Sequence, residues 1–127
     1  MTAVSLIQDV YAAFGRGDVA FILDRVSENV DWEFVGSPSL PYAGRRTNKA
    51  GVADFFAAVA KADTIHLFEP REYIATDDGV VVLGHERSTT NDTATDFESD
   101  WIHLFTVKEG IVTRWRGFFN TAARYGL

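Results

Sequence analysis

A carboxylate lies inside an aromatic stretch of this sequence, where it could act on protons. Glu33 stands between Trp32 and Phe34. Desolvation raises the pKa of a carboxyl group toward a value suited to removing a proton beside a carbonyl. The alternative is that both rings face the core while Glu33 or Asp31 faces solvent, because side chains alternate along a strand. Alternation alone slightly favours this second arrangement.

Residues 113–122 pose the same question of which face is inside. One face of a strand here would carry Arg114, Arg116, Phe118 and Asn120. The other face would carry Trp115 and Phe119. If the first face lines a cavity, a guanidinium and an amide could contact a ligand. If the tryptophan face is core, the arginines are ordinary solvated charges.

Arg87 and Arg116 are the possible interior cations of the chain. A buried guanidinium without a partner is too costly, so each would need an anionic ligand or a carboxylate. Glu33, Glu86 and Asp100 are examples of carboxylates that could serve as partners. A salt bridge at the mouth of a pocket or at a dimer contact explains the two arginines equally well.

Other kinds of chemistry have little support. His66, His85 and His103 lie on separate predicted strands without the spacing of a metal motif, and the chain has no cysteine. We therefore expect no metal site. A net charge of −6 and a pI near 4.9 argue against nucleic acid and anionic membranes as partners. The N-terminus lacks a basic region followed by an apolar run, so we expect a cytoplasmic protein.

Three helices are predicted in the first half of the chain. Apolar residues recur at helical spacing over residues 3–14, and Asp18 can cap a second helix. Thr47 or Asn48 can cap a third helix. The apolar stripe of this third helix consists of Val52, Phe55, Phe56 and Val59.

Strands dominate the second half of the chain. One strand is predicted at "NVDWEFVG", followed by a proline-marked loop. After residue 64, four further candidates are separated by "TDDG", "NDTA" and "KEG". These features predict an α+β fold, with three helices on the concave face of a strongly curved, mainly antiparallel sheet. At 127 residues we expect one domain, residues 1–127, with a cone-shaped interior and an aromatic central pocket.

The order of these motifs resembles the nuclear transport factor 2-like superfamily, in particular its SnoaL-like and ketosteroid-isomerase-like members. The motifs that carry the resemblance are "YAAFGRGD", "VDWEFVGSP", "YAGRRTNKAGVADFF" and "DWIHLFTVKEGIVTRWRGFFNTAA". Together they span nearly the whole chain. The resemblance implies a small-molecule pocket inside a cone and a homodimer formed through the outer face of the sheet.

Comparison with the steroid isomerases implies roles for two residues. Matching on "VGS" puts Glu33 at the place of their general-base aspartate, and "WIHLFTV" puts His103 at the place of their oxyanion donor. A histidine can donate to an oxyanion in either protonation state. The isomerases' tyrosine falls on Val10, and Tyr11 lies one step farther along. One step turns a helix by roughly 100°, so we expect the Tyr11 phenol to point elsewhere.

The last predicted strand resembles the last strand of limonene epoxide hydrolases and of SnoaL-like polyketide cyclases, but with an important difference. In "WRGFFN", Asn120 stands at the place of their acid or base aspartate. The hydrolases also have an Arg-x-Asp motif on an earlier strand; in "ERSTT" this chain has the arginine, Arg87, but Thr89 stands at the place of the aspartate. An amide cannot exchange a proton at neutral pH, although it can hold a water or a carbonyl. This resemblance, with that of the isomerases, puts the face of Arg116 and Asn120 inside the cone and Trp115 outside.

We therefore expect a cofactor-independent enzyme that transfers a proton on a small apolar carbonyl compound, as an isomerase, cyclase or dehydratase would. The catalytic candidates are Glu33, His103 and Asn120. The candidates for binding the substrate are Tyr11, Phe14, Phe56, Arg87, Trp101, Arg116 and Phe118. The alternatives are a binding protein without turnover, a divergent enzyme resembling epoxide hydrolases, or a structural dimerisation module whose pocket is filled by its own phenylalanines.

Overall fold

The helices begin where the sequence supplies polar caps. The computed structural model describes residues 2–127 and contains α1 (Ala3–Gly15), α2 (Val19–Leu23) and α3 (Lys49–Ala62) in the N-terminal half. The Asp18 side chain accepts a hydrogen bond from the backbone N–H of Phe21, and that of Asn48 accepts one from Gly51. These contacts satisfy N–H groups that have no partner within a helix. The predicted cap at Asp18 is confirmed, and Asn48 rather than Thr47 caps α3.

Within residues 2–127, six strands form one mixed sheet. They are β1 (Val26–Phe34), β2 (Gly44–Arg46), β3 (Asp63–Ala75), β4 (Gly79–Thr90), β5 (Asp96–Lys108) and β6 (Ile111–Phe119). Their order across the sheet is β2-β1-β6-β5-β4-β3, and only the β1–β6 pair is parallel. The predicted meander of four strands is confirmed as β3 to β6. The sequence did not predict β2 or the short α4 (Thr121–Arg124).

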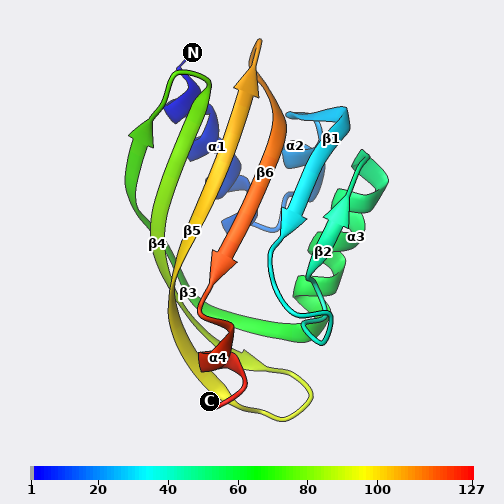
Figure 1. The fold of residues 1–127 in the computed structure, drawn as a ribbon, viewed down its shortest axis with the longest axis vertical. Coiled ribbons are helices and arrows are strands. Elements are labelled where there is room, and N and C mark those ends of the chain that lie inside the picture. Colours follow the sequence, from blue (N-terminus) through cyan, green and yellow to red (C-terminus); the bar gives the residue numbers. More distant parts are fainter. Residues whose placement is uncertain (1) are drawn as a thin grey trace.

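The sheet curves around the helices, so the α+β architecture expected from the sequence is confirmed. Figure 1 shows α1, α2 and α3 on one side of the sheet, with β1 and β2 close to α3 and the longer strands bending past α1. The helix α4 lies at the end of the sheet where β6 finishes (Figure 1). Within residues 2–127, no helix is both long and apolar enough to cross a membrane.

The two faces of the sheet differ along β5. Phe97, Ser99, Trp101, His103 and Phe105 are buried, whereas the intervening residues are exposed or partly exposed. This alternation is the pattern of a strand with one face on a core and the other open. The buried face of β5 lies toward the helices, and Trp101, His103 and Phe105 on this face line a cavity.

The face of β6 predicted to lie inside is the outer face, so that prediction is wrong. Trp115 is 3% exposed and stacks on Trp32 in the core, with 4.4 Å between ring centroids. Arg114 and Phe118 are exposed on the opposite face. The physical reason is that indole burial outweighs any gain from placing guanidinium groups in an apolar interior.

Candidate functional site

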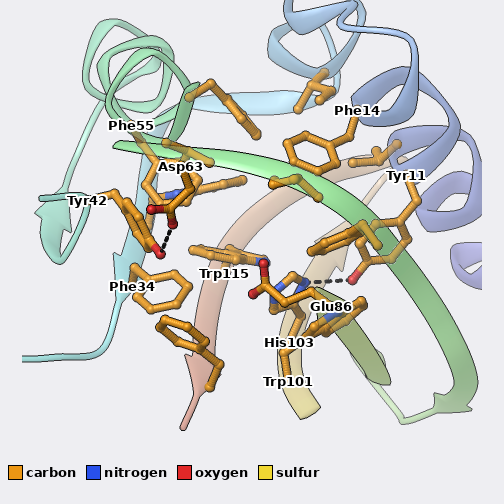
Figure 2. Close-up of a pocket in the computed structure, with 18 of the residues that line it drawn as sticks. Tyr11, Phe14, Phe34, Tyr42, Phe55, Asp63, Glu86, Trp101, His103 and Trp115 are labelled. Carbon is orange, nitrogen blue, oxygen red and sulfur yellow. Dashed lines mark hydrogen bonds between the residues drawn. The ribbon is translucent and has the colours of Figure 1, made fainter. Parts of the chain in front are cut away.

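A cavity of about 80 Å³ lies between the helices and the concave face of the sheet. Its walls are mostly aromatic rings, which come from α1, α3, β1, β3, β5, β6 and the loop before β2. Figure 2 shows these rings surrounding a few polar side chains, among them Glu86 and His103. The cavity therefore combines apolar walls with a small number of polar groups, which is the usual composition of a small-molecule site.

Tyr11 and His103 form a hydrogen-bonded pair inside the cavity. The Tyr11 hydroxyl lies 2.8 Å from Nδ1 of His103, which connects α1 to β5 (Figure 2). Burial lowers the pKa of His103 to about 3, so its imidazole is neutral at pH 7. Burial also raises the pKa of Tyr11 well above its usual value, and the nearby Tyr73 adds to that rise. Whichever partner donates across this bond, the pair keeps one further O–H or N–H donor.

Glu86 brings a carboxyl group into the cavity from β4. Burial is the main reason that the pKa of Glu86 is raised to about 7, and the Asp63 carboxylate adds to this rise. Ser88, which is fully buried, acts in the opposite direction by donating a hydrogen bond of 3.0 Å to Oε2 of Glu86. A carboxyl group with this pKa is present in both protonation states near pH 7, as general acid–base catalysis requires.

A buried ion pair lies at another part of the cavity wall. Nη2 of Arg124 lies 2.7 Å from Oδ1 of Asp63, and their side chains are only 4% and 2% exposed. The Tyr42 hydroxyl donates to Oδ2 of the same carboxylate at 2.7 Å. Because Arg124 belongs to α4, this pair fixes the C-terminal helix to the start of β3. Because each charge has an oppositely charged partner, the pair serves as a structural connection.

Glu33 lies outside the cavity, so its predicted place as a pocket base is wrong. Its neighbours Trp32 and Phe34 line the cavity, and alternation therefore places Glu33 on the outer face of β1. There Oε1 of Glu33 lies 3.5 Å from Nε of Arg116, and Nη2 of Arg116 lies 2.8 Å from Oδ2 of Asp31. The expectation that a buried Arg116 needs carboxylate partners is confirmed. Its predicted contact with the substrate is wrong.

Three other predicted site residues also lie outside the cavity lining. Arg87 and Phe118 are on the outer face of the sheet, and Asn120 is exposed at the start of α4. The arrangement of an epoxide hydrolase is therefore not assembled around the cavity. By contrast, the structure brings together Tyr11, Phe14, Phe56, Trp101 and His103. The phenol of Tyr11 enters the cavity, contrary to the direction expected from helix geometry.

Glu86 is a site residue that was not predicted, although the sequence contains a signal for it. Val80, Val82 and Gly84 precede Glu86 at intervals of two, and all three are buried. An alternating strand therefore places Glu86 on the same face as the buried valines. Asp63 and Tyr42 were also missed, and neither stands in a periodic pattern that would have identified it.

Comparisons with known proteins agree with this geometry. The model of the SnoaL-like domain family matches residues 7–115. An NTF2-like protein from Burkholderia xenovorans is 30% identical, with a TM-score of 0.87 over 98% of this chain and 93% of that chain. TerC, co-crystallized with polyporic acid, is 29% identical, with a TM-score of 0.86 over 98% of this chain and 96% of that one.

A further NTF2-like protein, from Burkholderia thailandensis, shares the fold at 20% identity. Its TM-score is 0.89, over 99% of this chain and 96% of that chain. None of the curated proteins matches the sequence. Tyr11, Glu86 and His103 all fall within the matched residues 7–115. The chain belongs to the SnoaL-like domain family and has the fold of the NTF2-like proteins.

Proposed function

We propose that this protein is a cofactor-independent enzyme that transfers a proton on a small, mostly apolar carbonyl compound, with Glu86 as the acid–base group. The observation that carries the proposal is the Glu86 carboxyl, whose pKa is raised to about 7 inside an aromatic cavity. Such a group can remove a proton next to a carbonyl and return it to another atom. In this proposal Glu86 takes the role first predicted for Glu33.

The Tyr11–His103 pair supports the second requirement of this chemistry. Removing a proton beside a carbonyl develops negative charge on the oxygen, and a positioned donor in a dry site stabilises that charge. The pair keeps one donor beyond its shared hydrogen bond, and both groups are neutral at pH 7. In Figure 2, Glu86 and His103 are both directed into the cavity from the neighbouring strands β4 and β5. The apolar walls suit a substrate with few polar atoms. TerC, a similar protein co-crystallized with polyporic acid, supports a small organic molecule as the ligand.

Hydrogen exchange tests this function directly. Acetophenone and related aryl alkyl ketones would be incubated with the protein in D2O, and loss of the α-proton signal would be followed by NMR. We expect Glu86→Gln to slow exchange by about 10²–10⁴-fold, while Glu33→Gln, on the outer face, keeps the wild-type rate. Exchange that survives in Glu86→Gln, or is absent from the wild type with every ketone, would contradict the proposal.

A binding protein without turnover is the second candidate function. It is favoured by the way the polar groups of the cavity already satisfy one another, as in the Tyr11–His103 and Ser88–Glu86 hydrogen bonds. Quenching of tryptophan fluorescence would report binding, because Trp101 lines the cavity. Saturable quenching by ketones that never exchange a proton would establish this second function.

We also propose that two copies pair through the outer face of the sheet. Ile102, Leu104 and Phe118 are 43%, 38% and 36% exposed there, and Ile102 lies opposite Phe118 across β5 and β6. Adjacent large apolar side chains on an outer face are typical of an interaction surface. Carboxylates of β5 and arginines of β6 flank these side chains, so the surface carries both negative and positive groups that could pair with their opposites on a second copy. Sedimentation should show a dimer that Ile102→Glu converts to a monomer and the distant Leu127→Glu does not.

A further inference from the structure

The cavity is too small to hold a substituted aromatic ligand completely. Its volume is about 80 Å³, whereas an apolar cavity of about 150 Å³ holds a benzene molecule. Pockets for small-molecule ligands commonly measure about 300–1,000 Å³. With the side chains as they stand, a ring that carries further groups can place only one end in the cavity.

A larger hollow of about 360 Å³ adjoins the cavity on the side of α1 and β3. We call it the α1–β3 groove. Four of the residues that line the groove also line the cavity, namely Tyr11, Phe14, Ile65 and Phe68. The two spaces are therefore separated by single side chains. Together they reach the size range of ordinary ligand pockets.

The dividing side chains are placed where a ligand would pass. All four are partly exposed, whereas Trp101 and His103, deeper in the cavity, are buried. The rings of Phe14 and Phe68 meet edge to face, with centroids 5.1 Å apart. An aromatic contact of this kind contributes only about 0.5–1.5 kcal/mol beyond its buried area, so a ligand with apolar surface can replace it.

The chemistry of the groove differs from that of the cavity. Leu67 and Pro70 supply apolar surface, while His66 and the backbone of β3 supply polar groups. Because β3 is an edge strand, backbone N–H and C=O groups on its free side have no strand partner. The register of β3 also shifts between Ile65 and Leu67, which interrupts regular pairing beside the groove. The groove thus suits a chain of apolar carbons with an occasional hydrogen-bonding atom.

We propose that the ligand of this protein has two parts, a carbonyl head in the cavity and an elongated tail that leaves between Phe14 and Phe68 and lies in the α1–β3 groove. The choice of a carbonyl head rests on the proposed function, and the placement of the tail rests on the two adjoining spaces. The substrate class is accordingly an aryl ketone with a long, mostly apolar substituent on the side of the ring away from the carbonyl.

Gly15 provides a way to fill the groove without disturbing the cavity. It lines the groove but not the cavity, and a side chain added there meets no atom within 4 Å. Gly15→Trp would therefore place an indole in the groove. Ala12→Trp is the matched control, because Ala12 is also exposed on α1 and lines neither space.

The experiment compares acetophenone with 4-hexyloxyacetophenone by quenching of tryptophan fluorescence in the wild type, Gly15→Trp, Ala12→Trp and Glu86→Gln. Each protein would first be checked for native circular dichroism. In the wild type we expect the hexyloxy compound to bind at least about tenfold more tightly, as burial of two or more methylenes would give. Gly15→Trp should remove this advantage of the hexyloxy compound over acetophenone, and Ala12→Trp should keep it.

Three results would overturn the proposal. These are equal affinity for the two ketones in the wild type, an advantage that persists in Gly15→Trp, and failure of both ketones to bind. The result is separable from the proposed function because Glu86→Gln should lose proton exchange yet keep the tail-dependent affinity. Tail-dependent binding without exchange in the wild type would leave the two-part ligand standing and refute only the catalytic proposal.

Discussion

The Tyr11 hydroxyl lies 2.8 Å from Nδ1 of His103, and through this contact α1 and β5 are joined inside the cavity. Neither group carries charge at pH 7, because burial raises the pKa of Tyr11 and lowers the pKa of His103 to about 3. The contact therefore acts as a neutral hydrogen-bonded unit, which orients a donor without placing an ion in an apolar site.

Removal of the Tyr11 hydroxyl should affect both stability and exchange. Tyr11→Phe leaves Nδ1 of a buried imidazole without its partner, so we expect the free energy of unfolding to fall by about 1–3 kcal/mol. Ketone exchange should slow about 10²-fold, as after loss of one oxyanion donor. Urea unfolding and NMR would measure the two effects. Tyr73→Phe is the control, since Tyr73 does not line the cavity, and an equal loss in both variants would argue against a special role for the pair.

Glu86 should make the protein less stable as the pH rises. Burial raises the pKa of Glu86 from 4.5 to about 7 in the folded state, so the folded protein binds a proton that the unfolded chain releases between these values. The contribution of this group to the free energy of unfolding therefore falls by about 3 kcal/mol between about pH 4.5 and pH 7, and it stays at the lower value above pH 7. Glu86→Gln should be more stable than the wild type at pH 8 in urea unfolding, and the difference should vanish near pH 4. A constant difference across this range would refute the assignment, and Glu33→Gln provides the matched comparison.

The Arg124–Asp63 pair should matter far more than an exposed ion pair. Arg124→Met leaves the Asp63 carboxylate buried beside Tyr42 without its cation, and we expect a loss of about 3–5 kcal/mol. Arg71→Met breaks an ion pair with Glu69 whose side chains are 55% and 46% exposed, so a loss below about 1 kcal/mol is expected. Similar losses for the two variants in chemical denaturation would show that the buried pair has no special weight.

Gly117 should tolerate no side chain, because two indole atoms occupy the necessary space. A Cβ there would lie 2.3 Å from Cη2 of Trp115, a ring that is itself buried in the core. Gly117→Ala should destabilise the protein by about 1–3 kcal/mol and alter the near-ultraviolet circular dichroism of the tryptophans. Gly15→Ala, where a methyl group meets open space, should be neutral or slightly stabilising. An unchanged melting temperature in Gly117→Ala would contradict the packing described for Trp115.

Much of the fold was accessible from local patterns in the sequence. The helix at residues 49–62 follows from an Asn cap and an apolar stripe, and the last four strands follow from alternation and turn residues. The strand β2 and helix α4 could not be predicted in this way, since three or four residues are too few to show a period. Both depend on tertiary contacts, namely pairing with β1 and the Arg124–Asp63 ion pair.

The site was harder to predict because β6 buries side chains on both of its faces. Along β6, Trp115 is buried in the core while Arg116 is buried on the other face by Asp31 and Glu33. Alternation distinguishes the faces only when one of them is exposed. Matching to the motifs of related enzymes then selected the wrong face, and Glu33 and Asn120 were misplaced with it.

The parallel pairing of β1 with β6 has a consequence for how quickly this chain can fold. Asp31 pairs with Arg114, about 80 residues later. Among the described residues, the partners of the long strand β1 in the sheet are β6 and the three residues of β2. Closing so long a loop costs chain entropy before any pairing is gained, and non-local pairings of this kind slow folding. The edge of β1, a strand with one apolar face, therefore stays unpaired until β6 has been added, and during that interval a second unfolded chain can pair with β1 in place of β6. Refolding yield should consequently fall as protein concentration rises.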